Sequence, residues 1–312
     1  MEDLSKLRML GRVPEGDTVH QAARRLDAAL TGKILEHTAF RTPEHHAFDL
    51  NGLKVGSVVS RGKHLLIRVA DATVHSLLSS GGRWDVYATG ERARSPIRNA
   101  LCVLRNRDFQ AVGIDLDVLR VFPTVREPEA VGHLGPDPLG HSWDPVEAAR
   151  RLALDPARPI GAALVDQRLI AGLGNVYRAE VLFTAGVNPH ASVGDVADLP
   201  RIVEIAHGLM NANRDHARRQ TASHGHGAPY WVFGRGGLPC PRCNVPVVHE
   251  FGGRLPAYLA PRTAALAAQS GGVPDLGGHD LFWCQQCQPL PAKRAVWNPE
   301  GGRSQGLVPK RR

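Results

Sequence analysis

Four of the five cysteines of this 312-residue chain stand in two short pairs near its end. The pairs are Cys240-Pro-Arg-Cys243 and Cys284-Gln-Gln-Cys287. A gap of two residues lets both thiolates of a pair reach one tetrahedral zinc ion from a single turn, and two such pairs predict a zinc ribbon. Two disulfides are the alternative, but a chain of this length can bury a core without covalent staples. The sequence therefore predicts one structural Zn²⁺ bound by these four cysteines.

The net charge of the chain indicates which class of partner such a ribbon could bind. Lys and Arg total 38 against 30 Asp and Glu, which gives a formal net charge of +8. A basic balance favours polyanions, because counterion release drives association with phosphate backbones. A solvated basic surface is the alternative. No segment has the pattern of a signal peptide or the length of a membrane span, so we expect a cytoplasmic protein with no membrane partner.

A stretch rich in glycine and proline at 133–144 predicts a linker between two domains. Before it, short apolar runs between turn residues predict strands at 55–60, 64–69, 73–77 and 99–104, with the spacing of a sandwich or barrel. Cys102 lies in one of these runs and is predicted to be a buried core residue. A helix over Asp17–Leu30, with Asp17 as its N-cap, is predicted before the strands.

Beyond the linker the pattern is helical, with helices predicted at 145–154, 160–169, 175–185 and 199–218. His216, His224 and His226 follow near Arg218 and Arg219. A second metal site is one interpretation of these histidines, and a solvated basic loop is the one that their spacing favours. The composition of residues 289–312 predicts a disordered basic tail.

Two glycines, Gly172 and Gly174, directly precede Asn175 at the expected start of a helix. Glycines let a backbone approach a ligand closely, and the amides at a helix start point toward an anion. A dinucleotide-binding loop does not fit, because no strand precedes the glycines and no third glycine follows at the right spacing. We expect Gly172, Gly174 and Asn175 to face a DNA phosphate; a plain corner between two helices is the structural alternative.

Four separated motifs carry a resemblance to a known family. They are Pro14-Glu-Gly-Asp-Thr-Val19, Ser60-Arg-Gly-Lys-His-Leu65, Gly172-Leu-Gly-Asn-Val-Tyr177 with Glu180, and Trp231-Val-Phe-Gly-Arg-Gly-Gly-Leu-Pro-Cys240. Over about residues 14–288 the chain resembles the Fpg/Nei family of DNA glycosylases, and most closely its actinobacterial endonuclease VIII-like branch.

The resemblance implies an α+β multidomain fold, with an N-terminal helix plus β-sandwich, a helix–two-turn–helix domain and a C-terminal zinc ribbon. The implied division is an extension at 1–13, a catalytic β-sandwich domain at 14–132, a linker at 133–144, a helix–two-turn–helix DNA-binding domain at 145–235, the ribbon at 236–288 and the tail at 289–312. Damaged DNA is the implied partner, bound by a monomer in the bacterial cytoplasm at the nucleoid.

The resemblance also implies a bifunctional glycosylase and AP lyase. Proline at a free chain start is a secondary amine, so Pro14 would attack the sugar C1′, displace the base and form an iminium that permits β,δ-elimination. Glu15 would transfer protons and Lys63 would hold a phosphate. Taken singly, these two residues have the plainer interpretations of a first-turn carboxylate and an exposed strand lysine. Oxidised pyrimidines are the expected substrates; oxidised purines, including formamidopyrimidines, are the alternative within the family.

The first departure from the family pattern is that thirteen residues precede Pro14, and an internal proline nitrogen is an amide that cannot form the iminium. Val13 suggests a start codon of the GTG type, read as methionine and trimmed, so that residues 1–12 would lie before the true start of the chain. If Pro14 stays internal, the alternative is a non-catalytic zinc-ribbon protein that binds DNA or lesions.

Two further departures concern the ribbon and the grip on DNA. Forty residues separate Cys243 from Cys284, which predicts a glycine-flanked insertion at about 252–278 that leaves the zinc site intact. His279 stands where the family carries a phosphate-binding arginine, and a neutral histidine binds phosphate less tightly than a bidentate arginine. Leu78 is the residue expected to fill the gap left by a flipped base, with Phe109 as the alternative.

Overall fold

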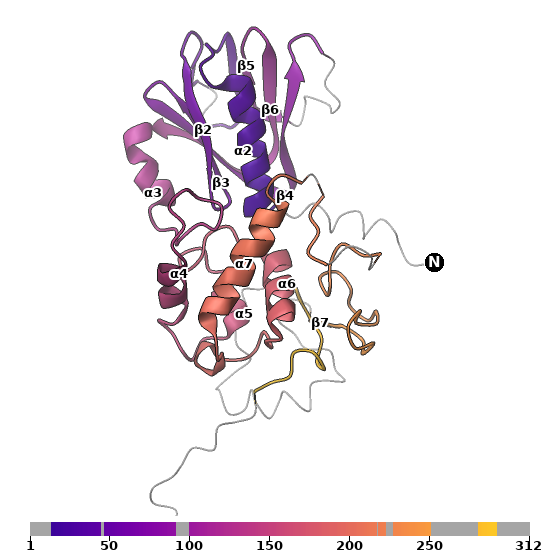
Figure 1. Cartoon of the computed structure of the whole chain (residues 1–312). Helices are drawn as coiled ribbons and strands as arrows, with labels where there is room; N and C mark the ends of the chain where they lie inside the picture. The colour runs from indigo at the N-terminus through magenta and orange to yellow at the C-terminus, as the bar shows by residue number, and fades with distance from the viewer. Residues whose placement is uncertain are drawn as a thin grey trace, which may run out of the picture.

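The computed structural model describes residues 14–44, 47–91, 100–216, 218–222, 227–250 and 280–291. The predicted extension at 1–13, the insertion at 252–278, His224, His226, His279 and the tail beyond residue 291 lie outside the described residues. Figure 1 shows a curled sheet with a helix along it, a group of helices below the sheet, and beside that group the segment of the ribbon, whose strands pair in a two-stranded sheet. The predicted order of a β-rich part, a helical part and a ribbon is confirmed; the boundaries between domains remain predictions.

Six antiparallel strands form one continuous sheet in the order β1-β5-β6-β4-β3-β2. They are β1 (His37–Phe40), β2 (Val55–Arg61), β3 (His64–Val69), β4 (Ala72–Ala88), β5 (Ala100–Arg105) and β6 (Phe109–Pro123). The four predicted strands correspond to β2, β3, β4 and β5, whereas β1 and β6 were not predicted. The pairing of β4 with β6 shifts register on both sides of Leu78, so that the next four residues leave the ladder. Such an irregularity bends a strand and lets the sheet curl.

Helix α2 (Gly16–Leu30) covers the main core of the sheet. Its buried stripe, which includes Leu26 and Leu30, packs with strand residues such as Leu65 and Ile67. Cys102 belongs to the same core and is buried, as predicted. The prediction that Asp17 caps this helix was wrong, because Glu15 occupies the N-cap position and Asp17 lies inside the first turn. The reason is that both acidic side chains bind other parts of the molecule, as described below.

The helical part contains α3 (Glu127–Val131), α4 (Pro145–Leu152), α5 (Ile160–Ala163), α6 (Asn175–Ala185) and α7 (Leu199–Asn213), with short 3-10 turns at Thr124–Arg126 and Val193–Asp195. The predicted helices at 145–154 and 175–185 are confirmed, while those at 160–169 and 199–218 end earlier than predicted. Helix α4 begins where Asp144 accepts hydrogen bonds from the amides of Val146 and Glu147. Helix α6 is buried along most of its length and ends at Gly186, whose φ of 71° is left-handed.

The ribbon pairs β7 (Val248–Glu250) with β8 (Leu281–Trp283), in antiparallel register with Val248 opposite Trp283. Its core is shared with α6, since Phe183 and Val176 of that helix cluster with Phe282 and Cys284. No helix among the described residues has the length and apolar character needed to cross a bilayer.

A pair of histidines on neighbouring strands is expected to make the stability of the sheet depend on pH. His64 Nδ1 lies 2.9 Å from His75 Nε2, and burial is the main cause that lowers the pKa of each to about 4. Unfolded histidine titrates near pH 6.5, so the unfolded chain binds more protons between these values, and the free energy of unfolding falls as pH drops through that window. At pH 5 the expected loss is roughly 2 kcal/mol per histidine, measured by urea unfolding at pH 7 and pH 5.

The control variants for that measurement are His75→Gln and His141→Gln. The first removes a buried member of the pair and should flatten the pH dependence; the second changes an exposed histidine and should leave it unchanged. An equal pH dependence in the wild type and in His75→Gln would contradict the prediction.

Candidate active site

Three glycines bring three distant segments into backbone contact. The amide of Gly16, at the start of α2, donates a 2.8 Å hydrogen bond to the carbonyl of Gly172. A Cβ on Gly62, in the turn between β2 and β3, would lie 3.1 Å from the amide nitrogen of Gly172. Gly62 and Gly172 also have left-handed φ values of 57° and 91°, which favour glycine. The side chains next to these glycines are therefore held close together.

Glu15 is fully buried at this junction. Its carboxylate accepts hydrogen bonds from the amides of Gly174 at 2.9 Å, Val176 at 2.8 Å and Tyr177 at 3.3 Å. These amides form the start of α6, where the helix dipole favours a negative charge. The helix start thus binds an anion, as the sequence suggested, but that anion is Glu15 of the same chain.

Lys63 occupies the two-residue turn between β2 and β3 and reaches the same place. A Cβ on Gly174 would lie 2.6 Å from Glu15 Cδ and 2.8 Å from Lys63 Nζ, so both charged groups flank the α-carbon of Gly174. Burial lowers the pKa of Lys63, and the negative charge of Glu15 opposes that shift. Pro14, next to Glu15 in the chain, is partly exposed. The structure therefore brings together Glu15 and Lys63, two of the three residues predicted to be catalytic, and the third, Pro14, adjoins Glu15 in the chain.

The space at Gly174 gives a direct test of this arrangement. In the variant Gly174→Ala the new methyl group has to displace Glu15 or Lys63, although the φ of −135° suits alanine. We expect activity to fall by roughly 10- to 100-fold, the scale of a misplaced catalytic group. The matched control is Gly208→Ala in α7, where an added Cβ meets nothing within 4 Å. Equal activity in both variants, measured as initial rates, would contradict this geometry.

Further charged residues surround the junction, and sequence reasoning did not assign them a role. Asp137 Oδ2 accepts a 2.6 Å hydrogen bond from the amide of Gly62, which fixes the turn that carries Lys63. Glu180, fully buried, accepts hydrogen bonds from the amides of Trp231, Val232 and Phe233. Arg219 lies in the segment interpreted as a basic loop, yet it is buried and paired with Asp17. The only sequence signal for Glu180 was its place in the third motif.

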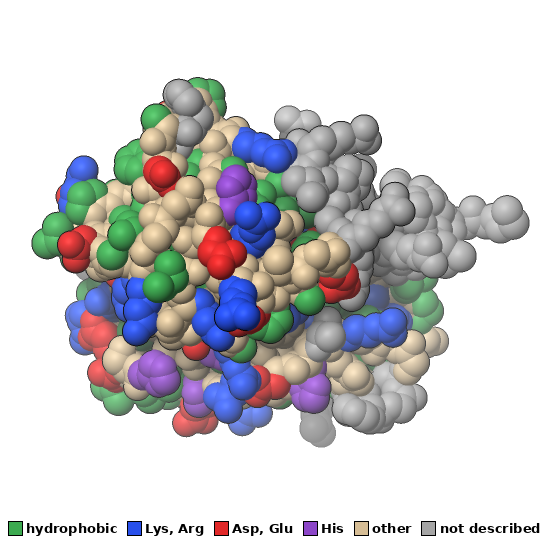
Figure 2. Space-filling view, turned by 90° about the horizontal axis from the view of Figure 1, so that it is seen from above, with side chains coloured by type: hydrophobic (Ala, Val, Ile, Leu, Met, Phe, Trp, Pro, Cys, Tyr) green, Lys and Arg blue, Asp and Glu red, His purple; other side chains and the backbone are tan. Residues whose placement is uncertain are grey.

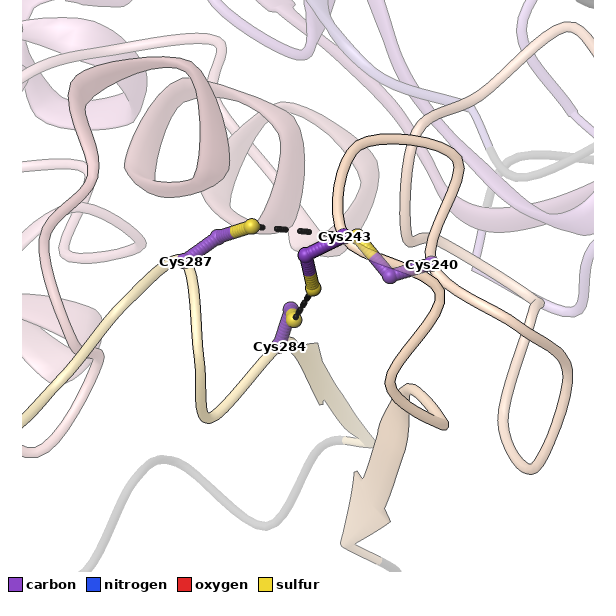
Figure 3. Close-up of side chains that lie close together, drawn as sticks. All are labelled: Cys240, Cys243, Cys284 and Cys287. Atoms are coloured by element: carbon purple, nitrogen blue, oxygen red, sulfur yellow. Dashed lines mark hydrogen bonds between the residues drawn. The ribbon is translucent and has the colours of Figure 1, made fainter.

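The four paired cysteines meet at one point of the ribbon (Figure 3). Among the residues that the structure describes, their sulfur atoms form a group in which all lie within 4.8 Å of one another. Cys240 Sγ is 3.9 Å from Cys287 Sγ, and Cys243 Sγ is 3.4 Å from Cys284 Sγ. Tetrahedral zinc with Zn–S bonds of about 2.3 Å requires sulfur separations of about 3.8 Å. The donor set and its geometry therefore fit a zinc ion.

The predicted DNA contacts are placed as follows. Asn175 is the first residue of α6, and the amide of Gly174 is already engaged by Glu15. Leu78 lies in β4 at the register shift, partly exposed and packed against the main core. On the face seen in Figure 2, Lys and Arg side chains lie among Asp and Glu side chains and do not form a single patch. The contacts of Gly172, Gly174, Asn175 and Leu78 with DNA stay predictions.

Comparisons with known proteins find relatives over most of the chain. The family model described as "Formamidopyrimidine-DNA glycosylase H2TH domain" matches residues 134–209. The chain is 42% identical over 303 residues to "Probable endonuclease 8 2" of Streptomyces coelicolor, covering 96% of this chain and 100% of that protein. It is also 42% identical over 250 residues to "DNA-(apurinic or apyrimidinic site) lyase Nei2" of Mycolicibacterium smegmatis, covering 80% and 98% of the two chains.

Solved structures share the fold. The MutM (Fpg) protein of Thermus thermophilus superposes with a TM-score of 0.67 at 24% identity, over 89% of this chain and 100% of that one. The Fpg of Lactococcus lactis, in complex with a DNA that contains N7-benzyl-Fapy-dG, gives a TM-score of 0.68 at 18% identity, over 88% and 100%. At these identities the likeness establishes the fold alone.

Proposed function

This chain belongs to the Fpg/Nei family of DNA glycosylases, and on that premise we propose that it is a bifunctional DNA glycosylase and AP lyase. It removes oxidised bases, preferentially pyrimidines, and then cleaves the strand by β,δ-elimination. The observation that carries the proposal is that Lys63 and Glu15, the chain neighbour of Pro14, flank the α-carbon of Gly174. The names of its endonuclease 8 and AP lyase relatives support the same activity.

In the proposed reaction the nitrogen of Pro14 attacks the sugar C1′, and the bond to the damaged base breaks with its electron pair leaving on the base. The Glu15 carboxylate takes up the proton that the Pro14 nitrogen loses and passes it to the sugar oxygen or the departing base, while solvent supplies the other proton, so that a neutral base leaves. The nitrogen lone pair of the adduct then forms an iminium with C1′ as the C1′–O4′ bond breaks and O4′ leaves as a hydroxyl, and this iminium acidifies the C2′ proton. Loss of that proton expels the 3′ phosphate, and a second elimination expels the 5′ phosphate. These reaction steps require a secondary amine, which Pro14 has when the chain begins at that residue.

The ammonium of Lys63 is proposed to bind a phosphate next to the reacting sugar. Burial lowers the pKa of this amine and so disfavours its charged form. A negative charge beside it, from Glu15 or from a DNA phosphate, favours the charged form. Gly172 and Asn175 are proposed to contact the backbone of the same nucleotide, with Leu78 filling the gap in the stack. A single protomer is sufficient for this arrangement, so we propose a monomer acting at the nucleoid.

The four ribbon cysteines are proposed to hold one zinc ion, and its chemistry there is structural because all four positions of a tetrahedral ion are filled by thiolates. The bound ion would cross-link the two turns, and residues before and between the cysteine pairs pack on α6. The ribbon thereby has a fixed position relative to the helix whose amides hold Glu15.

The test is borohydride trapping on a duplex oligonucleotide that carries dihydrouracil. Protein that begins at Pro14 is expected to form a covalent adduct, whereas protein that begins at Met1 is not, because its Pro14 nitrogen is an amide. A parallel duplex with a formamidopyrimidine separates the pyrimidine preference from the purine alternative. If neither form is trapped while zinc and DNA are bound, the protein is the non-catalytic lesion-binding protein.

A further inference from the structure

A buried ion pair joins the first turn of α2 to the segment that follows α7. Arg219 donates from Nε to Asp17 Oδ2 at 2.7 Å and from Nη2 to Asp17 Oδ1 at 2.5 Å. Both side chains are nearly inaccessible, with 7% and 2% of their surfaces exposed. Arg219 Nη2 also donates to Thr18 Oγ1, and its guanidinium lies over the ring of Tyr177. The hydroxyl of Tyr177 in turn donates to Asp17 Oδ2 at 3.0 Å.

The location of this pair is unusual for a device that only stabilises the fold. Replacing a buried ion pair by apolar residues of similar volume is often neutral or stabilising, so its presence is weak evidence of a role in stability. Asp17 also stands in the first helical turn, where a carboxylate would favour the helix start, yet its oxygens are directed to Arg219 and Tyr177. Tyr177 is one of the residues whose amide holds Glu15. The pair is therefore connected to the Glu15 carboxylate in two ways. One residue separates Asp17 from Glu15 in the chain, and Tyr177, which contacts the pair, binds Glu15 through its amide.

Electrostatics link the pair to the same site. Burial alone would lower the pKa of Arg219, but the negative charges of Glu15 and Asp17 raise it. The positive charge of Arg219 is in turn one of the causes that lower the pKa of Lys63. These four groups share one poorly solvated space, so a change in one is felt by the others.

The segment that carries Arg219 has further anchors on both sides. The amide of Gln220 donates to Asn213 Oδ1, and Gln21 of α2 donates to the carbonyls of Asn213 and His216. Thr221 donates to the buried carboxylate of Glu180. Among these contacts of the described residues, the Asp17–Arg219 pair combines a full charge pair with a position next to Glu15. It is the contact through which this segment can affect the start of α2.

We propose that Asp17 and Arg219 are positioning residues for base excision, which hold Pro14 and Glu15 in alignment by fixing the start of α2 against residues 218–222. This inference rests on the proposed function. Displacing a base requires that the amine, the sugar C1′ and the proton donor be aligned at the same moment. An abasic site is different, because its open-chain aldehyde condenses with an amine while no base has to leave. Loss of the pair should therefore slow base excision more than cleavage at an abasic site.

The experiment compares Arg219→Gln, Arg219→Lys, Asp17→Asn and the double variant Asp17→Asn/Arg219→Gln, all beginning at Pro14. Single-turnover rates are measured at saturating DNA on a dihydrouracil duplex and on a duplex with a preformed abasic site. We expect Arg219→Gln and Asp17→Asn each to lose roughly 10- to 100-fold in excision and less than about 3-fold in abasic-site cleavage. The double variant should resemble the singles, since both changes break one contact. Arg219→Lys keeps the charge but loses the two-pronged contact, so it should retain an intermediate rate.

The chain offers a matched control in Arg24 and Asp215, an exposed ion pair that joins the same two elements. Because exposed pairs contribute little, Arg24→Gln and Asp215→Asn should keep wild-type rates on both substrates. Equal losses on the two substrates, together with a lower melting temperature, would show a merely structural pair and overturn the inference. Unchanged excision in Arg219→Gln would overturn it as well. Failure of the wild type to excise dihydrouracil would instead overturn the proposed function.

Discussion

Replacing Glu15 by glutamine is expected to lower the rate of base excision by about 10²- to 10⁴-fold, the usual contribution of a general acid or base. Glutamine has nearly the same shape, but it cannot give up a proton. It also presents an amide donor to a site where two carboxylate oxygens accept from Gly174, Val176 and Tyr177. At least one amide then loses its acceptor, and the free energy of unfolding should fall by about 1–3 kcal/mol. Single-turnover excision and urea unfolding measure the two effects separately.

The control for this variant is Glu129→Gln. Glu129 is exposed and pairs with Arg126 three residues away in the same chain segment, an arrangement that contributes little to stability. It should keep both the excision rate and the stability of the wild type. If Glu15→Gln excised dihydrouracil at the wild-type rate, Glu15 would not be the proton donor, whatever its stability.

Much of the fold could be predicted because its signals are local. The two-residue gap within each cysteine pair led directly to the cluster of sulfur atoms, and short apolar runs between turn residues gave four of the six strands. Strand β6 was missed although Asp115, Asp117 and Arg120 alternate with buried apolar residues there. Strand β1 has only four residues and is too short for such a pattern to be distinctive.

The candidate site was predictable as a set of residues but not as a geometry. Pro14, Glu15 and Lys63 were found from motifs, yet no motif indicates that the amides opening α6 bind Glu15 and not a ligand. Arg219 was interpreted as part of a solvated loop because its partner, Asp17, lies 202 positions away in the chain. A charged residue gives no sign in the sequence of whether it is buried. The burial of Arg219 and the binding of Glu15 by the amides of α6 therefore depend on contacts between distant segments, which local sequence patterns do not reveal.

Loss of the zinc ion is the second change for which we expect a large effect, here on the folding of the ribbon. Among the described residues the ribbon has one pair of three-residue strands, and its core is shared with Val176, Ala179 and Phe183 of α6. Structural zinc sites contribute about 10–16 kcal/mol of binding free energy that is also folding free energy. The variant Cys284→Ser should therefore lose the metal, unfold the ribbon and expose the face of α6 that it covers. Metal content by mass spectrometry and amide exchange along β7 and α6 measure these changes.

Cys102→Ala is the matched control, because Cys102 is equally buried but belongs to the core of the sheet. It should retain one zinc ion per chain and normal protection of β7. In Cys284→Ser the loss should spread beyond the ribbon, since Glu180 of α6 holds the three amides of Trp231, Val232 and Phe233 that lead to the first cysteine pair. Hydrogen exchange should therefore become faster at these three amides and base excision should become slower, because loss of the zinc site disorders both the ribbon and the segment that Glu180 holds. Retention of one zinc ion per chain in Cys284→Ser would contradict the four-cysteine site.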